Sequence, residues 1–499
     1  MVTGPRRVSR RQVLVGAVGA VAFGAAVSGW TWAVGGSARL VAPDGTAAAS
    51  VEAARRRAGG RTIPATLTPR PVSLDLGGPT VSTWGYTDSP DGQVIRARAG
   101  DLLRVEVDNR LPVDTSVHWH GVALRNDMDG VPGLTQAPIP AGARHTYAFT
   151  VPDPGTYFFH PHTGLQLDRA LHGVLIVDDP AEPGRYDAEW IVVLDDWVDG
   201  TGRTPDEVLT GLRSMGAMGD MAMAGGGTGM ERYVSPLLGG TGDVAYPWYL
   251  VNGRVPTAPV TFTGRPRQRV RLRLVNAAAD TAFRVALGGH RLTLTHTDGW
   301  SVTPTDADAL LLGMGERADV TVTLADGVFP LVASAEGKSG QAVAVVRTGA
   351  GDAPPADARP GELDQAVLVT GAQPVPDAVR LPDRAVDRTH DLVLDGAMMP
   401  YRWTINGADY AHSAPLTVRQ GERVRLRLIN RSAMFHPMHV HGHTFAVVGS
   451  GTRKDTVIVP ARQTVTVDLD ADNPGQWMTH CHNPYHAETG MMVNLAYLA

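Results

Sequence analysis

Hydrophobic and polar residues alternate along most of the chain, which is the pattern of β-strands with one buried face. Residues 102–107 read Leu-Leu-Arg-Val-Glu-Val, and Gly, Pro, Asp and Asn residues separate such runs. Helical periodicity is weak and is confined to two short stretches, residues 47–57 and 205–213. The pattern therefore predicts an all-β protein built from many short strands.

One strand pattern occurs three times, which indicates internal repetition. Its copies, DLLRVEVDN, RVRLRLVN and ERVRLRLIN, end at Asn109, Asn276 and Asn430. Nine residues later the first and third copies have His118 and His439, whereas the middle copy has a valine. Three related domains are therefore predicted. The middle domain is expected to be a spacer, or a wall on the substrate side, without metal ligands.

A segment rich in Pro, Ala and Asp is expected to link the second domain to the third. An N-terminal extension precedes the first domain. The predicted boundaries are residues 1–61 for an export signal and linker, 62–180 for the first domain, 181–348 for the second, 349–384 for the linker and 385–499 for the third.

Composition narrows the functional classes. The chain is 43% hydrophobic and 19% charged, which is ordinary for a globular protein, and 57 Gly and 36 Pro fit a fold with many turns. A formal net charge of -5, without a basic stripe beyond the N-terminus, gives no reason to expect nucleic acid as a partner. A single cysteine excludes an intramolecular disulfide.

The N-terminus predicts the location of the protein. Arg10 and Arg11 precede an apolar run over residues 13–34, and this arrangement is similar to a twin-arginine export signal. The chain is therefore expected in the periplasm, the cell envelope or the extracellular space. An uncleaved membrane anchor is the alternative, since about 20 apolar residues can span a bilayer. It would be the only expected contact with a membrane.

The single cysteine lies among other soft metal ligands. Cys481, His486 and Met491 fall within a dozen residues, and His436 supplies a further imidazole. Two histidines, a cysteine and a weak axial methionine make a blue copper centre for electron transfer. A buried, inert free cysteine is the alternative interpretation. Four histidine pairs elsewhere in the chain argue against it.

These pairs have the form His-Xaa-His. In a strand, residues two apart share a face, so each pair presents two imidazoles side by side. Eight imidazoles exceed the four ligands of a structural zinc and suit a cluster of three copper ions. His443 continues one pair but is expected to be a packing residue. The pairs are His118 and His120, His160 and His162, His439 and His441, and His480 and His482.

The four motifs, in this order and spacing, resemble those of the three-domain multicopper oxidases, the family of laccases, ascorbate oxidase and bacterial cuprous oxidases. The resemblance covers residues 62–499. It implies three cupredoxin-like Greek-key β-barrels and four copper ions. It further implies a type 1 copper held by His436, Cys481, His486 and Met491, a type 2 copper held by His118 and His439, and a type 3 pair held by His120, His160, His162, His441, His480 and His482.

The resemblance also implies a reaction. A reducing substrate loses one electron at the type 1 copper, electrons pass through Cys481 to His480 and His482, and O2 is reduced to water by four electrons. Oxygen reduction consumes protons. Asp129 is similar in position to the family's proton donor, although a turn residue before a glycine is an equal alternative. Cuprous oxidases place a second carboxylate directly after the last histidine ligand, where this chain has alanine followed by Glu488.

The electron donor is left open between phenols or aromatic amines and Cu(I). Methionines in the glycine-rich residues 215–230 could hold Cu(I), or could be adaptable apolar residues of a loop. Met434 resembles a methionine through which cuprous oxidases pass electrons from Cu(I), but Ser432 stands where they have an acid.

Two other classes of copper protein fit the sequence less well. A copper nitrite reductase would lack the eight-histidine cluster. A non-catalytic cupredoxin-fold protein of copper binding or copper tolerance would have lost its ligands.

Overall fold

Strands dominate the structure, a computed structural model that describes residues 39–499 except 57–58, 91, 180–181, 183–184 and 218–234. The all-β prediction is confirmed. Helices form at both predicted stretches, α1 (Thr46–Arg55) and α2 (Pro205–Ala217). Within the described residues, no helix is long and apolar enough to cross a membrane. The predicted export signal lies outside them.

The first predicted domain contains nine strands in two larger sheets and a hairpin. The sheet orders are β1-β5-β7 and β4-β9-β8-β6, with β2 paired to β3. Trp119, Phe149 and Phe159 are buried in the core of this part of the chain. The strands are β1 (Thr62–Leu67), β2 (Arg70–Asp75), β3 (Thr80–Gly85), β4 (Gln93–Arg98), β5 (Leu102–Asp108), β6 (His118–His120), β7 (Arg144–Thr150), β8 (Gly155–His160) and β9 (Gly173–Asp178), and a 3-10 turn, η1, spans Asn126–Met128.

The second part consists of two six-stranded sheets, with orders β11-β10-β13-β18-β15-β16 and β12-β20-β19-β14-β17-β21. Strand β21 (Val367–Val369) lies in the segment predicted as a linker, where it pairs in parallel with β17. The other strands are β10 (Ala188–Trp197), β11 (Trp248–Val251), β12 (Thr261–Thr263), β13 (Arg269–Asn276), β14 (Phe283–Leu287), β15 (Leu292–Thr297), β16 (Trp300–Ala307), β17 (Ala309–Leu312), β18 (Arg317–Thr323), β19 (Val328–Ala335) and β20 (Gln341–Arg347).

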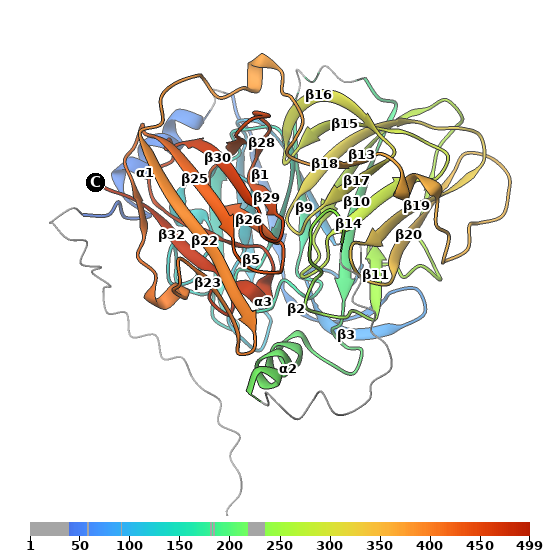
Figure 1. Ribbon diagram of the computed structural model, residues 1–499, viewed down its shortest axis with the longest axis horizontal. Helices are drawn as coiled ribbons and strands as arrows, with labels where there is room; N and C mark the ends of the chain where they lie inside the picture. Colours follow the sequence, from blue (N-terminus) through green and yellow to red (C-terminus); the bar gives the residue numbers. More distant parts are fainter. Residues whose placement is uncertain (1–38, 57–58, 91, 180–181, 183–184, 218–234) are drawn as a thin grey trace, which may run out of the picture. The chain divides into compact units, whose positions relative to one another are not determined.

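The third part has a six-stranded sheet, β23-β22-β25-β30-β27-β28, and a five-stranded sheet, β24-β32-β31-β26-β29. Helix α2 packs against β23 (Figure 1). The strands are β22 (Arg388–Met398), β23 (Tyr401–Ile405), β24 (Leu416–Val418), β25 (Arg423–Asn430), β26 (His436–Val440), β27 (Phe445–Val447), β28 (Arg453–Lys454), β29 (Thr456–Val459), β30 (Thr464–Asp470), β31 (Gln476–Cys481) and β32 (Met492–Tyr497), with a short helix α3 (Pro484–Ala487).

The internal repeat corresponds to β5, β13 and β25. Each has a parallel neighbour on one side and an antiparallel neighbour on the other, namely β1 and β7, β10 and β18, and β22 and β30. The asparagines that end the three copies, Asn109, Asn276 and Asn430, are buried. Each donates its side-chain amide to a backbone carbonyl further along the chain, that of Ile139, Leu312 or Val459, which satisfies those buried groups. The repeated sequence thus builds the same local topology three times.

An N-terminal arm ties the first and third parts together. The backbone N–H of Val41 donates to Tyr497 O at 2.8 Å, beside the C-terminal strand β32. In α1, a carboxylate oxygen of Glu52 accepts the N–H of Thr150 at 2.7 Å, at the end of β7. Arg55 donates to a backbone carbonyl of the first part and to the side chain of Asn473 in the third.

Candidate metal centre

Two pairs of antiparallel strands bring the histidines of the four His-Xaa-His motifs together. In the first part, His118 on β6 lies opposite His160 on β8. In the third part, His439 on β26 lies opposite His480 on β31. The two strand pairs meet face to face: the ring centroids of His118 and His441 are 3.8 Å apart. Residues more than 300 positions apart therefore share one buried cluster.

Within this cluster the ligand sets implied by the resemblance, two triads and a pair, each consist of neighbouring rings, and other groups are equally close, such as His118 with His439 and His441. The ligand atoms of His162, His441 and His480 all lie within 4.8 Å of one another. The rings of the second triad are 4.8 to 5.8 Å apart, and the rings of the remaining pair are 5.6 Å apart. The second triad is His120, His160 and His482, and the pair is His118 and His439.

The ring nitrogens are arranged for metal binding. The Nδ1–H groups of His118, His160 and His480 donate to backbone carbonyls of Asp129, Pro161 and Cys481, at 2.9, 2.9 and 2.8 Å. A hydrogen bond on one ring nitrogen leaves the other with a lone pair for a metal ion. Within the cluster, the buried ring nitrogens without a hydrogen-bond partner are His118 Nε2, His120 Nδ1, His160 Nε2, His162 Nε2, His439 Nε2 and both nitrogens of His482.

Electrostatics also favour neutral imidazoles, which is the metal-binding form. Burial, followed by repulsion between neighbouring imidazoles, lowers the pKa of His480 and His482 well below the ordinary value. The same causes lower the pKa of His162 to about 3. Buried polar atoms normally have partners, so a group of unpartnered imidazole nitrogens fits bound copper ions.

A second centre is formed by His436, Cys481 and His486. The Cys481 Sγ atom lies 3.6 Å from His436 Nδ1 and 3.5 Å from His486 Nδ1, and the two Nδ1 atoms are 3.1 Å apart. Met491 is fully buried, and its backbone oxygen accepts the N–H of Cys481 at 3.1 Å. These donors match the His2Cys set of a blue copper site.

The short helix α3 returns His486 to the cysteine. Asn483 caps its N-terminus, accepting the N–H groups of Tyr485 and His486 with its side-chain oxygen. Pro484 occupies the first turn, where its missing N–H costs no hydrogen bond. The chain thus turns sharply within five residues of Cys481.

Each histidine of this centre has an outer partner. The Nε2 atom of His436 lies 2.8 Å from Ser432 Oγ, and that of His486 lies 2.9 Å from Asp243 Oδ2. Asp243 also accepts the hydroxyl of Tyr401 at 2.7 Å. Nothing in the sequence identified Asp243, because it belongs to no motif and comes from a different part of the chain.

Trp403 was also missed. Its ring lies 4.1 Å from that of His486 and 5.2 Å from that of His436, measured between ring centroids. Trp403 is 1% exposed and belongs to β23. Alternation along β23 marks it as a core residue, but nothing local in the sequence points to copper.

Asp129 contacts the cluster directly. Its Oδ2 atom accepts the Nδ1–H of His441 at 2.9 Å, and its Oδ1 atom lies 3.2 Å from His118 Nδ1. It also precedes a tight turn: φ of Gly130 is +80°, and a Cβ atom there would lie 1.8 Å from Val117 O. Asp129 therefore combines the turn position with contacts to two histidines.

Glu488 does not belong to this histidine cluster. It is exposed, and its backbone oxygen accepts a hydrogen bond from Arg213 of α2 at 3.1 Å. This position gives no support to a role as a second proton donor. The Nδ1–H of His443 donates to His441 O, and its Nε2 atom accepts the hydroxyl of Tyr497 at 2.6 Å, which agrees with the packing role expected for it. Met434 is half-buried, and most of the methionine-rich residues 215–230 lie outside the described residues.

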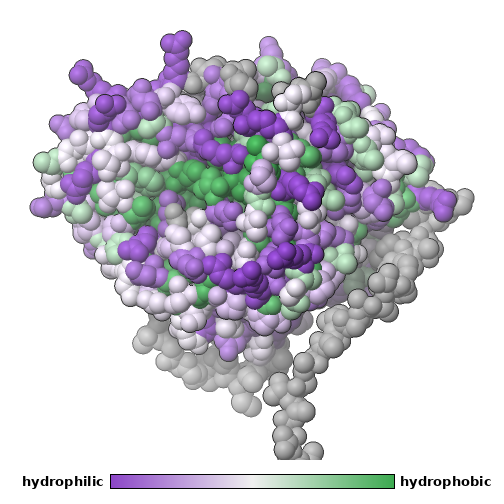
Figure 2. All heavy atoms as spheres, turned by 180° about the vertical axis from the view of Figure 1, so that it is seen from behind, coloured by the Kyte–Doolittle hydropathy of each residue, from purple (hydrophilic) through white to green (hydrophobic). Residues whose placement is uncertain are grey.

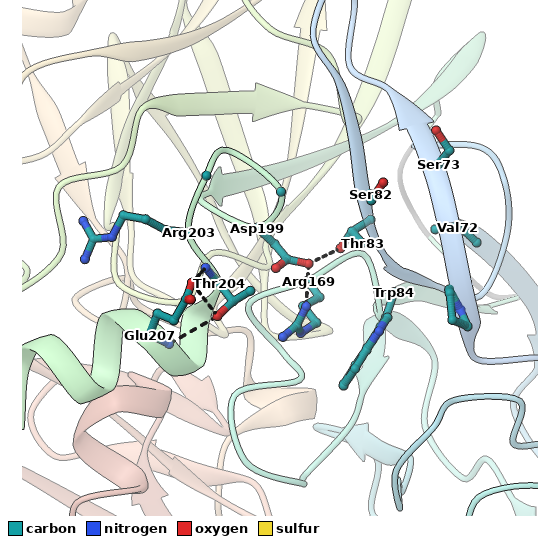
Figure 3. Close-up of a pocket in the computed structure, with 13 residues that line it drawn as sticks. Val72, Ser73, Ser82, Thr83, Trp84, Arg169, Asp199, Arg203, Thr204 and Glu207 are labelled. Carbon is teal, nitrogen blue, oxygen red and sulfur yellow. Dashed lines mark hydrogen bonds and ion pairs between the residues drawn. The ribbon is translucent and has the colours of Figure 1, made fainter. Parts of the chain in front are cut away.

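Surface pockets do not coincide with the predicted ligands. One, of about 640 Å³, lies between β2, β3 and the start of α2, where Arg169 stacks on Trp84 and pairs with Asp199 (Figure 3). Another, of about 580 Å³, is lined by residues that include Trp190 and Phe262. Apolar residues also gather in a band across the face shown in Figure 2. None of the residues lining either pocket is a predicted copper ligand.

Comparison with known proteins agrees with this donor set. Three family models, each described as multicopper oxidase, match residues 70–182, 189–351 and 384–498. The chain is 51% identical over 462 residues to the multicopper oxidase MmcO of Mycobacterium tuberculosis, covering 91% of this chain and 90% of that protein.

Two further matches are more distant. The chain is 28% identical over 512 residues to the copper resistance protein A homolog of Pseudomonas syringae pv. tomato, covering 80% of this chain and 86% of that protein. The crystal structure of laccase from Botrytis aclada superposes with a TM-score of 0.70 at 25% identity, covering 87% of this chain and 88% of that one.

Proposed function

Because the chain belongs to the multicopper oxidase family, and is thus a copper-dependent oxidoreductase that oxidises a reducing substrate with O2, we propose that its two histidine centres together hold four copper ions. The observation that carries this proposal is the set of buried ring nitrogens without hydrogen-bond partners, gathered next to a buried His-Cys-His group. Bound copper would supply one-electron redox chemistry at both centres.

The proposed ligand sets are those implied by the resemblance to multicopper oxidases. His118 and His439 would hold the type 2 ion. The two triads would hold the type 3 pair. His436, Cys481 and His486 would hold the type 1 ion, with Met491 as the weak axial ligand. This assignment is supported by the proximity of the donors within each set.

Cys481 connects the two centres. Cys481 ends β31, and its neighbours in the sequence are His480 and His482, one in each triad. A hydrogen bond of 2.8 Å from His480 Nδ1 to Cys481 O adds a second route beside the covalent one. We propose that electrons pass from Cys481 to the triads by this short path.

Asp129 would serve the oxygen-reducing centre. Its carboxylate accepts the Nδ1–H of His441 and so orients that ring. Because it is buried beside the cluster, it is also placed to deliver protons through water to reduced oxygen. We propose both roles for this residue.

Cu(I) is the proposed electron donor. The side chains of His486 and Asp243 are each 1% exposed, so a donor passes its electron to this centre without direct contact with the copper-ligating ring. Met399, at the hairpin between β22 and β23, is 64% exposed and offers a soft thioether ligand. The copper resistance protein A homolog among the relatives is consistent with this choice.

Oxygen uptake tests the donor. Wild-type protein loaded with copper is given either Cu(I) or a phenol, and the rates are compared with those of a Met398→Leu, Met399→Leu double variant. The Cu(I) rate should fall in the double variant while the phenol rate stays the same. Shortening residues 215–230 gives a second, independent comparison. Equal rates for Cu(I) in all three proteins would refute Cu(I) capture by methionine.

Copper analysis and absorption test the copper sites themselves. Four copper ions per chain and the intense visible band of a copper thiolate are expected. Cys481→Ser should abolish the visible band and leave the histidine cluster loaded. A preparation that is blue but holds one copper per chain would contradict the cluster.

Export by a twin-arginine-type signal is proposed for residues 1–38. The support is the Arg10-Arg11 pair followed by an apolar run. Replacing both arginines with lysine should retain the protein in the cytoplasm, and fractionation of expressing cells measures this. Unchanged export of the lysine variant would exclude this route.

A further inference from the structure

A turn of the second part of the chain packs directly against the histidines, although that part supplies no predicted copper ligand. Residues 313–316 connect β17 to β18. At Gly315 φ is +81°, and a Cβ atom would lie 2.8 Å from the ring of His482 and 3.0 Å from that of His120. A side chain at this position has neither space nor a relaxed backbone. The middle domain is therefore a wall of the metal centre.

Arg317, the first residue of β18, extends this wall. It is fully buried, and its Nε donates to Thr156 O at 3.1 Å. Its two terminal nitrogens donate to both carboxylate oxygens of Asp455, at 2.7 and 2.5 Å. This two-pronged geometry fixes the orientation of a carboxylate more strictly than a single bond does. Arg317 thus joins β8, β18 and the β28–β29 junction at one point.

Asp455 in turn contacts a predicted type 3 ligand. Its Oδ1 atom lies 3.1 Å from the Nε2 atom of His120 and accepts the hydroxyl of Thr456, whose oxygen lies 3.0 Å from the same Nε2 atom. This ring is reversed relative to its neighbours. In His118, His160 and His439, Nδ1 is hydrogen-bonded and Nε2 has no partner, whereas in His120 Nε2 is hydrogen-bonded and Nδ1 has no partner. His120 therefore needs an acceptor on its Nε2 side.

We propose that Arg317 and Asp455 are positioning residues of the oxygen-reducing centre. Arg317 holds the Asp455 carboxylate, the carboxylate accepts the Nε2–H of His120, and the lone pair of His120 is thereby kept on Nδ1 and directed at copper. The inference rests on the proposed ligand set, in which His120 binds a type 3 ion. It gives the middle domain a chemical role in a site whose ligands come from the other two.

The backbone next to His120 is built around the same ion pair. At Gly121 φ is +83°, and a Cβ atom would lie 2.4 Å from Arg317 Nη2 and 2.4 Å from Asp455 Oδ2. Only glycine lets the chain pass this close to both charged groups. This close packing fixes the position of the His120 backbone relative to the Asp455 carboxylate.

Two substitutions test the proposal in the copper-loaded protein. Asp455→Asn keeps the shape of the side chain but replaces an acceptor oxygen with an amide nitrogen. Arg317→Lys keeps the positive charge but loses the two parallel hydrogen bonds of the guanidinium group. Both should weaken copper retention at the histidine cluster about 10–100-fold, the usual effect of removing an outer partner of a metal ligand. Competition with a chelator measures retention, while the visible band of the type 1 site should remain.

A second readout needs no copper. In metal-free protein labelled with 15N-histidine, NMR should show His120 protonated at Nε2. The Asp455→Asn variant should shift this ring toward the Nδ1–H form. A role limited to stability would not move the tautomer, so this measurement separates positioning from general packing. Arg317→Lys is measured in the same way, and it decides the question if Asp455→Asn does not fold.

Two reference variants complete the experiment. Arg169→Lys alters another buried pair, in which Arg169 donates to Asp199 at 2.6 Å beside Trp84, and it should leave copper retention unchanged. His120→Ala should lose copper from the cluster. If it does but Arg317→Lys and Asp455→Asn retain copper and tautomer, the positioning role is overturned. If His120→Ala itself retains the full copper content, the ligand assignment fails instead.

Discussion

The Nε2 atom of His486 lies 2.9 Å from a carboxylate oxygen of Asp243, and both side chains are buried. Because Nδ1 of His486 faces Cys481, Nε2 carries the hydrogen and donates it to Asp243. The second domain thus places a negative charge behind a predicted type 1 ligand. Such a charge makes the imidazole more electron-rich and stabilises oxidised copper.

Asp243→Asn should therefore raise the reduction potential of the type 1 site. A hydrogen bond to a charged group contributes about 1.5 kcal/mol or more, which corresponds to about 60 mV for a one-electron couple. Redox titration of the visible band measures the shift. Tyr401→Phe is the control, because it removes a hydrogen bond to the same carboxylate but keeps the charge. An unchanged potential in Asp243→Asn would show that the contact does not tune copper.

Asp129→Asn should slow reoxidation of the reduced enzyme by O2 about 10–100-fold, because the amide neither delivers a proton nor orients His441 as a carboxylate does. Stopped-flow recovery of the visible band after an oxygen pulse measures the rate. Reduction of the type 1 site by substrate should be unaffected. Glu488→Gln, at an exposed carboxylate, is the matched control and should reoxidise at the normal rate.

The histidine motifs could be read from the sequence because their geometry is local. Two residues apart on a strand share a face, so His118 and His120 had to project together wherever β6 lay. The internal repeat could be recognised for the same reason, since each copy forms a central strand with one parallel and one antiparallel neighbour.

The roles of residues that act across domains could not be predicted from the sequence. Arg317 and Asp455 are 138 positions apart and meet only when the second and third domains pack. Charged residues on strands are usually solvated, so nothing distinguished these two from the many other Arg and Asp residues. Strand β21 was missed because three residues in a proline-rich segment carry no clear alternation, and its pairing with β17 comes from the packing of the chain around them.

Asn473 should contribute strongly to stability at the junction of the first and third domains. Its side-chain amide donates to Leu124 O and to Gly442 O, each at 2.9 Å, and its oxygen accepts from Arg55. Asn473→Ala removes the donor of Gly442 O and leaves Leu124 O with only the longer bond from Arg55, at 3.4 Å, so it should lower the free energy of unfolding by about 2–3 kcal/mol. Denaturant unfolding measures the change.

Arg55→Ala is the companion variant at this junction. It removes the arm's contribution, including the bond to Ala123 O at 2.6 Å, but leaves Asn473 in place, so a smaller loss of stability is expected. A larger loss of stability in Arg55→Ala than in Asn473→Ala would show that the N-terminal arm contributes most of the stability of this junction.

Metal-free protein should lose stability as the pH falls below about 6.5, the ordinary pKa of histidine. Burial, followed by repulsion from neighbouring imidazoles, lowers the pKa of His160, His480 and His482 well below that value in the folded state. Below pH 6.5 the unfolded chain binds protons that the folded chain does not, so the free energy of unfolding decreases by about 1.4 kcal/mol per pH unit for each such histidine. Thermal unfolding between pH 7.5 and 5 measures the slope. Replacing His160 with glutamine should reduce that slope by one proton, and a slope that is flat in the wild-type protein would contradict neutral, buried imidazoles in the folded state.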